Sequence, residues 1–245
     1  MKILVCISNV PDTTSKISFT DGNKSFNAAG VQFIINPYDE IALTRAIELK
    51  ESLGGNVTVI NVGKADTEAN IRKALAIGAD DAIRVNADPT DGFYVASQIA
   101  HVAKANGYDI ILTGKESIDY NGSEMAGMIA ELADMPSVSL ASKLDIAGTT
   151  ATLEREIEGG KEIVTTSLPF AASAQKGMAE PRIPNMRGIM SARTKPLQVL
   201  EPVESAQFTK VEGYELPQPK AACKMVPSDN VAELVNLLHN EAKII

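Results

Sequence analysis

The chain has 245 residues, 44% of them hydrophobic, which is enough to bury one large core without disulfide bonds or metal ions. Its net charge of −8 and its lack of tryptophan argue against a surface that binds nucleic acid. Two cysteines, no signal-peptide pattern and no apolar run of about 20 residues lead us to expect a cytoplasmic protein without membrane insertion.

Short β-branched runs alternate with helical patterns in the first part of the chain. The helical patterns carry apolar residues three and four positions apart, and most end at a glycine such as Gly78 or Gly107. This alternation predicts an α/β fold with a doubly wound, mostly parallel sheet. The predicted strands are residues 3–7, 57–61, 82–85 and 109–113, and the predicted helices are residues 39–52, 66–77, 91–105 and 123–133.

The pattern changes after about residue 140, where strand-like runs follow one another without helices. Residues 144–147 and 151–158 meet through Gly148. A turn at Gly159 then leads into residues 162–167, which predicts a β-hairpin region.

Residues 168–196 form a polar stretch that four prolines hold extended, which predicts a long surface loop. Met178 lies in its middle, and an exposed methionine on a mobile loop suits contact with more than one partner surface. The alternative interpretation is an ordinary linker between domains. The prolines are Pro169, Pro181, Pro184 and Pro196.

The last part of the chain is expected to form an extended C-terminal arm. It begins with a predicted strand at 197–201, continues through a proline-rich connector and ends in an amphipathic helix at 230–242. The apolar stripe of that helix packs either on another chain or back on its own domain. We therefore divide the chain into a nucleotide-binding-type α/β domain, 1–196, and an arm, 197–245.

Ligands of doubly wound sheets bind beyond the carboxyl ends of the strands, so the loops 8–15, 62–65 and 114–124 are the candidate binding segments. The last of them offers backbone N–H groups, Lys115 and Ser123 to an anion, either as a phosphate cradle or as a plain capped turn. Residues 36–40 either cap the helix that follows or place Tyr38 against a planar ring.

Conventional catalytic groups are scarce. His101 and His239 have no serine, cysteine or carboxylate at a recognisable spacing, and we expect both on the surface. Cys6 lies on an apolar strand and is expected to be a buried, inert thiol, and no metal site is expected. This pattern argues against a hydrolase or a transferase and favours a protein that binds a cofactor whose own chemistry does the work.

Several segments, taken in this order, resemble the β subunit of electron-transfer flavoproteins. They are Lys2-Ile3-Leu4-Val5-Cys6-Ile7, residues 35–42, residues 71–80, residues 112–119, residues 153–160, and a loop with Leu168-Pro169, Glu180-Pro181-Arg182, Ile189-Met190-Ser191-Ala192 and Lys195-Pro196. The resemblance spans nearly the whole chain. It implies an adenine-nucleotide α-hydrolase-like fold and a heterodimer with an α subunit that holds most of one FAD.

In that heterodimer, electrons pass from flavin-containing dehydrogenases to an acceptor, and the β chain is a carrier subunit without catalysis of its own. The resemblance leaves three states of the β pocket open: AMP, a second FAD, or an empty site. It implies partner recognition by Met178, Glu180, Pro181 and Arg182, with Met178 as the apolar anchor. The implied cofactor-binding residues are Cys6, Asn36, Pro37, Tyr38, Asp39, Val62, Gly114, Lys115, Asp119, Asn121, Gly122, Ser123, Glu124 and Met125.

One departure from the family pattern bears on the pocket. Glu124 stands where an amide faces phosphates, so its carboxylate lowers phosphate affinity unless it turns away. The alternative function is a universal-stress-like nucleotide-binding module without a redox role, against which the long tail after residue 168 counts. An adenylating enzyme of the same fold would need glycines after the first strand, where the chain has Ser8-Asn9-Val10-Pro11-Asp12.

Overall fold

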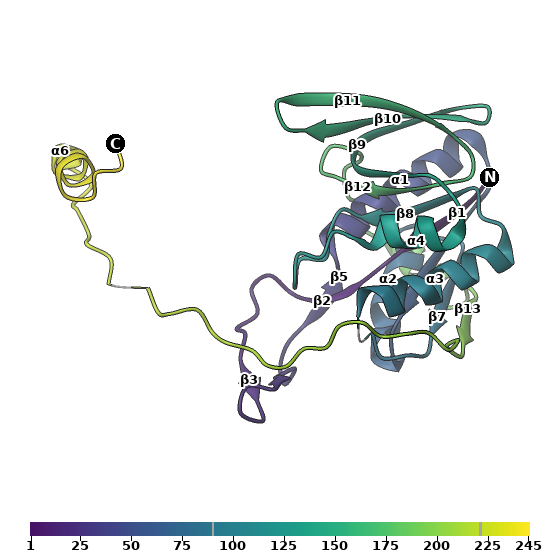
Figure 1. Cartoon of the computed structure of the whole chain (residues 1–245), viewed down its shortest axis with the longest axis horizontal. Helices are drawn as coiled ribbons and strands as arrows, with labels where there is room; N and C mark the ends of the chain where they lie inside the picture. Colours follow the sequence, from purple (N-terminus) through teal and green to yellow (C-terminus); the bar gives the residue numbers. More distant parts are fainter. Residues whose placement is uncertain (90, 221) are drawn as a thin grey trace.

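A computed structural model describes residues 1–89, 91–220 and 222–245. One large sheet forms the centre of the molecule, with helices on both faces, and a long arm carries the C-terminus away from it (Figure 1). The predicted fold class, a doubly wound, mostly parallel α/β sheet with a β-hairpin region and an extended C-terminal arm, is confirmed.

Nine strands within the described residues form the sheet, and seven adjacent strands run parallel to one another. The antiparallel strands β10 and β11 make the hairpin region at one edge. In sheet order the strands are β11 (Gly160–Ser167), β10 (Thr150–Ile157), β9 (Ser137–Ala147), β12 (Phe170–Ala174), β8 (Ile110–Gly114), β1 (Lys2–Cys6), β6 (Asn56–Val62), β7 (Asp81–Val85) and β13 (Leu197–Leu200).

Helices cover both faces of the sheet because each carries an apolar stripe that must be buried. Side chains of α1, α2 and α5 share one core with Phe170, and those of α3 and α4 share a second core on the opposite face with Ile111. The helices are α1 (Pro37–Leu53), α2 (Glu68–Ile77), α3 (Gly92–Asn106), α4 (Met125–Ala133), α5 (Met186–Ala192) and α6 (Val231–Asn236).

The remaining elements are short. A 3₁₀ turn, Ala65–Thr67, precedes α2, and a π-helical turn, Leu237–Glu241, follows α6. Two small antiparallel pairs lie in the connection between β1 and α1. They are β2 (Asn9–Pro11) with β5 (Phe33–Ile35), and β3 (Phe19–Thr20) with β4 (Ser25–Phe26).

The order of the strands reverses between β1 and β8. The chain runs from β1 to β6 and β7 on one side, and α3 then carries it across to β8 on the other side. The ladder between β1 and β8 pairs Ile3 with Ile110 and ends at Val5 and Leu112, so the residues that follow diverge. We call the carboxyl ends of these two strands the switch point, the place where doubly wound sheets bind ligands.

The expectation of an irregular surface loop over residues 168–196 is wrong for two segments. Phe170–Ala174 is a fully buried strand between β9 and β8, and Met186–Ala192 is a helix. A strand buried on both faces shows no apolar–polar alternation, and the alanines of β12 lack the β-branched signature of a strand. The small side chains let α1 and α4 pack against β12.

The first half of the arm packs on its own domain. β13 pairs with β7, and the side chain of Gln98 exchanges hydrogen bonds of 2.9 and 2.8 Å with the backbone of Val203. Tyr214 stacks on Phe19 with 4.6 Å between ring centroids. The described residues from 216 onward then leave the body (Figure 1). Packing on a partner subunit therefore stays a prediction for these later residues.

Asp91 joins the arm to α3. One carboxylate oxygen caps the helix by accepting from Tyr94 N, and the other accepts from the backbone N–H groups of Phe208 and Thr209. Replacing Asp91 by alanine is expected to lower the free energy of unfolding by about 1–2 kcal/mol, the usual cost of a lost cap. Urea denaturation checks this, with the exposed Asp66→Ala as a control that stays within about 0.5 kcal/mol.

The same variant should speed hydrogen exchange at the amides of Phe208 and Thr209, because their acceptor is gone. Unchanged exchange there would show that the arm is held by its other contacts alone.

Candidate functional site

Asp39 lies at the centre of the switch point. It stands in the first turn of α1, and its side chain is only 3% exposed. One carboxylate oxygen accepts from Ser8 N at 2.7 Å, just beyond β1. The other accepts from Gly114 N at 2.9 Å, at the end of β8. The carboxylate therefore links the two strands beyond the point where their own ladder stops.

Burial decides the protonation of the two groups nearest this centre. It raises the pKa of Asp39 to about 6, although hydrogen bonds from Ser8, Asn36 and Gly114 act in the opposite direction. Burial also raises the pKa of the Cys6 thiol, and the nearby Asp39 carboxylate adds to the effect. Cys6 is therefore a protonated, buried thiol, in agreement with the inert role expected for it.

Asn36 extends the linkage to the segment after β8. Its Nδ2 donates to Asp39 at 3.0 Å and to the carbonyl of Glu116 at 2.8 Å. Asn36 precedes α1 but makes no side-chain cap hydrogen bond, so capping does not explain it. The structure thus brings together residues 36–39 and 114–118, which are far apart in the sequence.

Tyr38 and Lys115 lie at the outer side of this junction. The Lys115 ammonium is 4.8 Å from the centre of the Tyr38 ring and 3.1 Å from a carboxylate oxygen of Glu116. Tyr38 therefore already faces a cation of its own chain, and its ring lies next to the loop that follows β8.

The loop from Asp119 to Met125 leads into α4. Ser123 Oγ donates to the carbonyl of Lys115 at 2.7 Å, and Asn121 has a left-handed backbone with φ 57°. Glu124 occupies the N-cap of α4 but makes no side-chain cap hydrogen bond. A Cβ built on Gly92 would lie 2.8 Å from Oε1 of Glu124, so this carboxylate points toward the start of α3.

Two predicted site residues contribute apolar surface. Cys6 and Val62 belong to the core between the sheet and helices α3 and α4, and each lies at or just before the end of a parallel strand. They form the inner wall next to the switch point. The other predicted cofactor-binding residues lie at the end of β8, in the loop that follows it, or at the start of α1 or α4.

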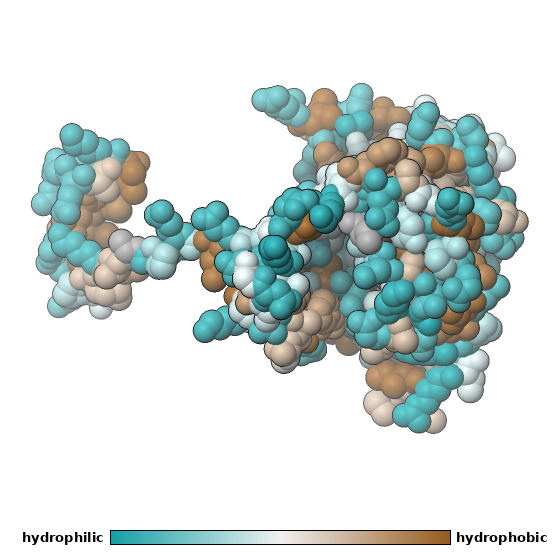
Figure 2. Space-filling model, turned by 60° about the horizontal axis from the view of Figure 1, so that its bottom comes forward, coloured by the Kyte–Doolittle hydropathy of each residue, from teal (hydrophilic) through white to brown (hydrophobic). Residues whose placement is uncertain are grey.

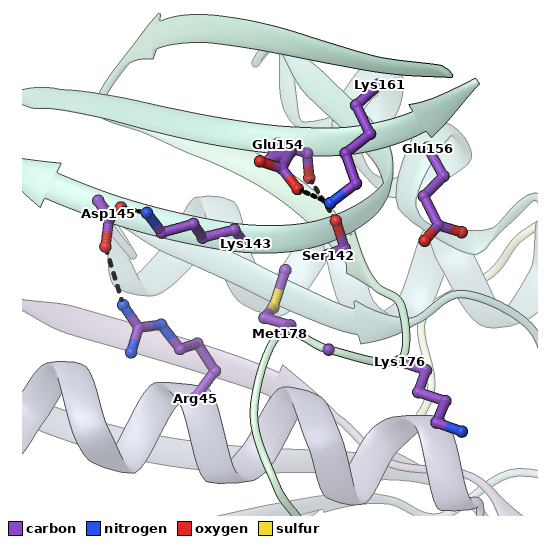
Figure 3. Close-up of a pocket in the computed structure, with 10 residues that line it drawn as sticks. Arg45, Ser142, Lys143, Asp145, Glu154, Glu156, Lys161, Lys176 and Met178 are labelled. Atoms are coloured by element: carbon purple, nitrogen blue, oxygen red, sulfur yellow. Dashed lines mark hydrogen bonds and ion pairs between the residues drawn. The ribbon is translucent and has the colours of Figure 1, made fainter. Parts of the chain in front are cut away.

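The predicted anchor Met178 is not exposed. Its side chain is 6% exposed and belongs to the core that includes α1. Figure 3 shows it between α1 and the hairpin strands, at the floor of a cavity of about 450 Å³ with charged walls. The expectation of an exposed knob at Met178 is therefore wrong, because the short segment after β12 turns back over α1.

Arg182 holds the following segment against α1. Its guanidinium donates to both carboxylate oxygens of Glu51 at 2.7 and 2.8 Å, and its backbone N–H donates to Thr44 Oγ1 at 3.2 Å. The hydrogen bonds from the Arg182 guanidinium hold the pKa of Glu51 below its ordinary value. Glu180 and Pro181, by contrast, are exposed.

Four large apolar side chains in the same segment are exposed, and all of them except Ile189 lie mostly in solvent. Ile183 is 91%, Met186 73% and Met190 68% exposed, and we call them the apolar ridge. They are not identified from the sequence, because the prolines of residues 168–196 predict an irregular loop. The signal was present: Asn185 can cap a helix, and it does accept from Gly188 N at 2.8 Å, with Met186 and Met190 one turn apart.

The described ranges 1–89, 91–220 and 222–245 contain neither a metal-binding cluster nor a membrane-spanning helix. No group of three or more His, Cys, Asp or Glu side chains is placed to hold a metal ion. No helix there has both the length and the apolar character needed to cross a membrane.

A sequence model described as "Electron transfer flavoprotein domain" matches residues 24–205. The chain is 38% identical to the electron transfer flavoprotein subunit beta of Bacillus subtilis, with all of both chains covered. The chain belongs to the electron transfer flavoprotein β-subunit family. It is also 38% identical to that subunit of Syntrophomonas wolfei, over 91% of this chain and 88% of the relative, and 31% identical to that of Homo sapiens, over 96% of each.

Membership of this family confirms the resemblance drawn from the sequence segments. The matched residues 24–205 include Asp39, Gly114 and the apolar ridge. The full-length relatives also cover the arm beyond residue 205, which the domain match does not. The match to the full-length relatives therefore spans both the switch point and the arm.

Proposed function

We propose that this chain is the β subunit of a heterodimeric electron-transfer flavoprotein. Its α subunit would hold most of one FAD, which supplies the electron transfer between flavin-containing dehydrogenases and an acceptor. The observation that carries this proposal is the full-length match to proteins named as that subunit. The chain itself would act as a carrier subunit and docking surface, not as an enzyme.

The distal arm is proposed to pack on the α subunit. Its terminal helix exposes an apolar stripe, and Figure 2 shows hydrophobic and hydrophilic atoms mixed at this detached end. An amphipathic helix held away from its own domain leaves apolar surface in water, which a partner groove would cover. The exposed apolar residues of this end are Val231, Leu234, Val235, Ile244 and Ile245.

The switch point is proposed to hold a nucleotide, with AMP favoured and a second FAD as the alternative. The start of α4 fits a phosphate, because its first N–H groups lack a side-chain cap and Glu124 points away from them. Gly122 and Ser123 would approach the phosphate with their backbone, and Asn36 to Asp39 would border the base. Lys115, whose ammonium lies over the Tyr38 ring, would contribute positive charge.

The apolar ridge is proposed as the docking surface for dehydrogenases, together with the exposed Glu180 and Pro181. Residues 181–200 contain four basic residues and no acidic one, in a chain whose net charge is −8. Ile183, Met186 and Met190 would fill an apolar depression with an acidic border on the partner. Arg182 would serve by holding the segment before α5 on α1, while α5 itself packs on α2. Met178, buried between α1 and the hairpin strands, would hold the start of the same segment in place.

The test is to co-express this chain with the α subunit from the same genome and to release and quantify the bound cofactors. One FAD and one AMP per heterodimer are expected. Two FAD without AMP would assign the second flavin to the switch point, and one FAD alone would leave it an empty site. Failure to form a flavin-bearing complex would contradict the proposal and favour a nucleotide-binding module without a redox role.

A further inference from the structure

The switch point contains a buried carboxylate that binding of a nucleotide does not explain. Both oxygens of Asp39 are already used by donors of its own chain, and its side chain is almost fully buried. A ligand at the surface of the site would meet the loops around Asp39, not the carboxylate itself.

We infer that Asp39 is the positioning residue of the nucleotide site: its carboxylate fixes the loops after β1 and β8 relative to α1. The inference rests on the proposed function, because it concerns the same site. It goes further, because it states that one side chain, which does not touch the ligand, holds the loops of that site in place.

The geometry supports this role. Beyond Val5 and Leu112, strands β1 and β8 no longer pair. Asp39 then supplies the acceptors that the ladder lacks, for Ser8 N on one side and for Gly114 N on the other. Gly114 leads directly into the segment whose residues Lys115 and Ser123 shape the start of α4, so its position decides where the phosphate-facing N–H groups lie.

Gly114 is matched to this carboxylate. A Cβ at position 114 would overlap Oδ1 of Asp39 and lie 2.9 Å from its backbone nitrogen. Only glycine leaves room for the backbone N–H to approach the carboxylate so closely. The two residues therefore act as a pair, one supplying the acceptor and the other the space.

Asp39 is also poorly suited to a purely structural role. The titratable groups facing it are the Cys6 thiol on β1 and the Tyr120 phenol from the loop before α4, neither of which is a cation. Lys115 turns to Tyr38 and Glu116 instead. An ionised carboxylate buried without a cation opposes folding, and such groups cluster at functional sites.

A structural role and a positioning role of Asp39 predict opposite changes with pH. The pKa of Asp39 in the folded chain, about 6, exceeds the ordinary value of 3.8, so the folded state holds this proton more tightly. The contribution of Asp39 to stability therefore falls as pH rises through this range. The ionised carboxylate accepts from all three donors. The loops after β1 and β8 should therefore be held more firmly as pH rises through the same range.

The experiment uses the complex of the full chain with its α subunit, stripped of nucleotide, with AMP as the probe in calorimetric titration. Asp39→Asn keeps the size of the side chain but turns an N–H group toward Ser8 N. At pH 7.5 this variant is expected to bind AMP about tenfold more weakly than wild type. At pH 5.0, where Asp39 is protonated, the two affinities should converge.

Glu40→Gln is the matched control. Glu40 is the next residue in α1, and its carboxylate pairs with Lys73 at 2.6 Å, away from the switch point. The Glu40→Gln variant removes one negative charge from the same helical turn, and it should bind AMP as tightly as wild type at both pH values. AMP changes its own charge between these pH values, but this affects every variant alike.

Equal AMP affinity of wild type and Asp39→Asn at pH 7.5 would overturn the inference while leaving the nucleotide site standing. No AMP binding by wild type would instead reject the proposed site, and the inference with it. If Asp39→Asn does not fold, Asp39→Ser carries the test, because it removes the carboxylate without opposing Ser8 N. Hydrogen exchange at Ser8 and Gly114 should be faster in either variant, and unchanged exchange counts against the role.

Discussion

Replacing Phe170 by alanine should lower the free energy of unfolding by roughly 3–5 kcal/mol, among the largest effects of any single substitution in this chain. Phe170 begins β12 and is among the largest side chains that are completely buried. It packs in the core that α1 and α2 cover, where neighbouring side chains cannot collapse fully into the space left behind. Chemical denaturation followed by circular dichroism measures the change.

The control is Ile163→Ala on the edge strand β11, where the side chain is exposed. It should change the free energy of unfolding by less than about 0.5 kcal/mol. A similarly small effect of Phe170→Ala would mean that residues 170–174 are a surface loop after all, as the sequence pattern first indicated.

Replacing Met186 by aspartate should slow reduction of the bound flavin by a partner dehydrogenase roughly 10- to 100-fold. Met186 is the central side chain of the apolar ridge, and a charge there must lose its water when the partner docks. The heterodimer and its flavin content should stay as in wild type, because the side chain faces solvent. Stopped-flow measurement of flavin absorbance checks the rate.

Ile163→Asp is the matched control, since it places the same charge at an exposed apolar position outside the ridge. Its rate should equal that of wild type. Equal rates for Met186→Asp would remove the ridge from the interface. Met178→Asp does not test docking, because a charge in the buried core between α1 and the hairpin strands should destabilise the fold itself.

The parallel strands and their helices followed from the sequence because their patterns are local. Val57 to Asn61 reads as a strand without reference to any other segment, and Gly78 ends α2 as predicted. The strand-end loops of the candidate site could be predicted next, because the carboxyl ends of parallel strands lie at one edge of the sheet. Family resemblance then named the residues on those loops.

The errors arose where tertiary packing overrides local pattern. The run Ala171-Ala172-Ser173-Ala174 has little strand propensity, and only the helices on both faces of the sheet make it a buried strand. Met178 gave the same sequence signal as an exposed methionine. The linkage from Asp39 to Gly114 spans 75 positions and depends on strand order, so no local pattern indicates it.

In the proposed heterodimer, the arm would provide a second point of attachment, separate from that of the body. From residue 216 to residue 230 the chain has about 15 residues, which reach at most about 50 Å when extended. Once the body is bound, the terminal helix searches only this small volume, equivalent to a local concentration in the millimolar range. Two weak contacts can then hold the subunits firmly, and we expect exchange of subunits to be slow even where each contact alone is short-lived.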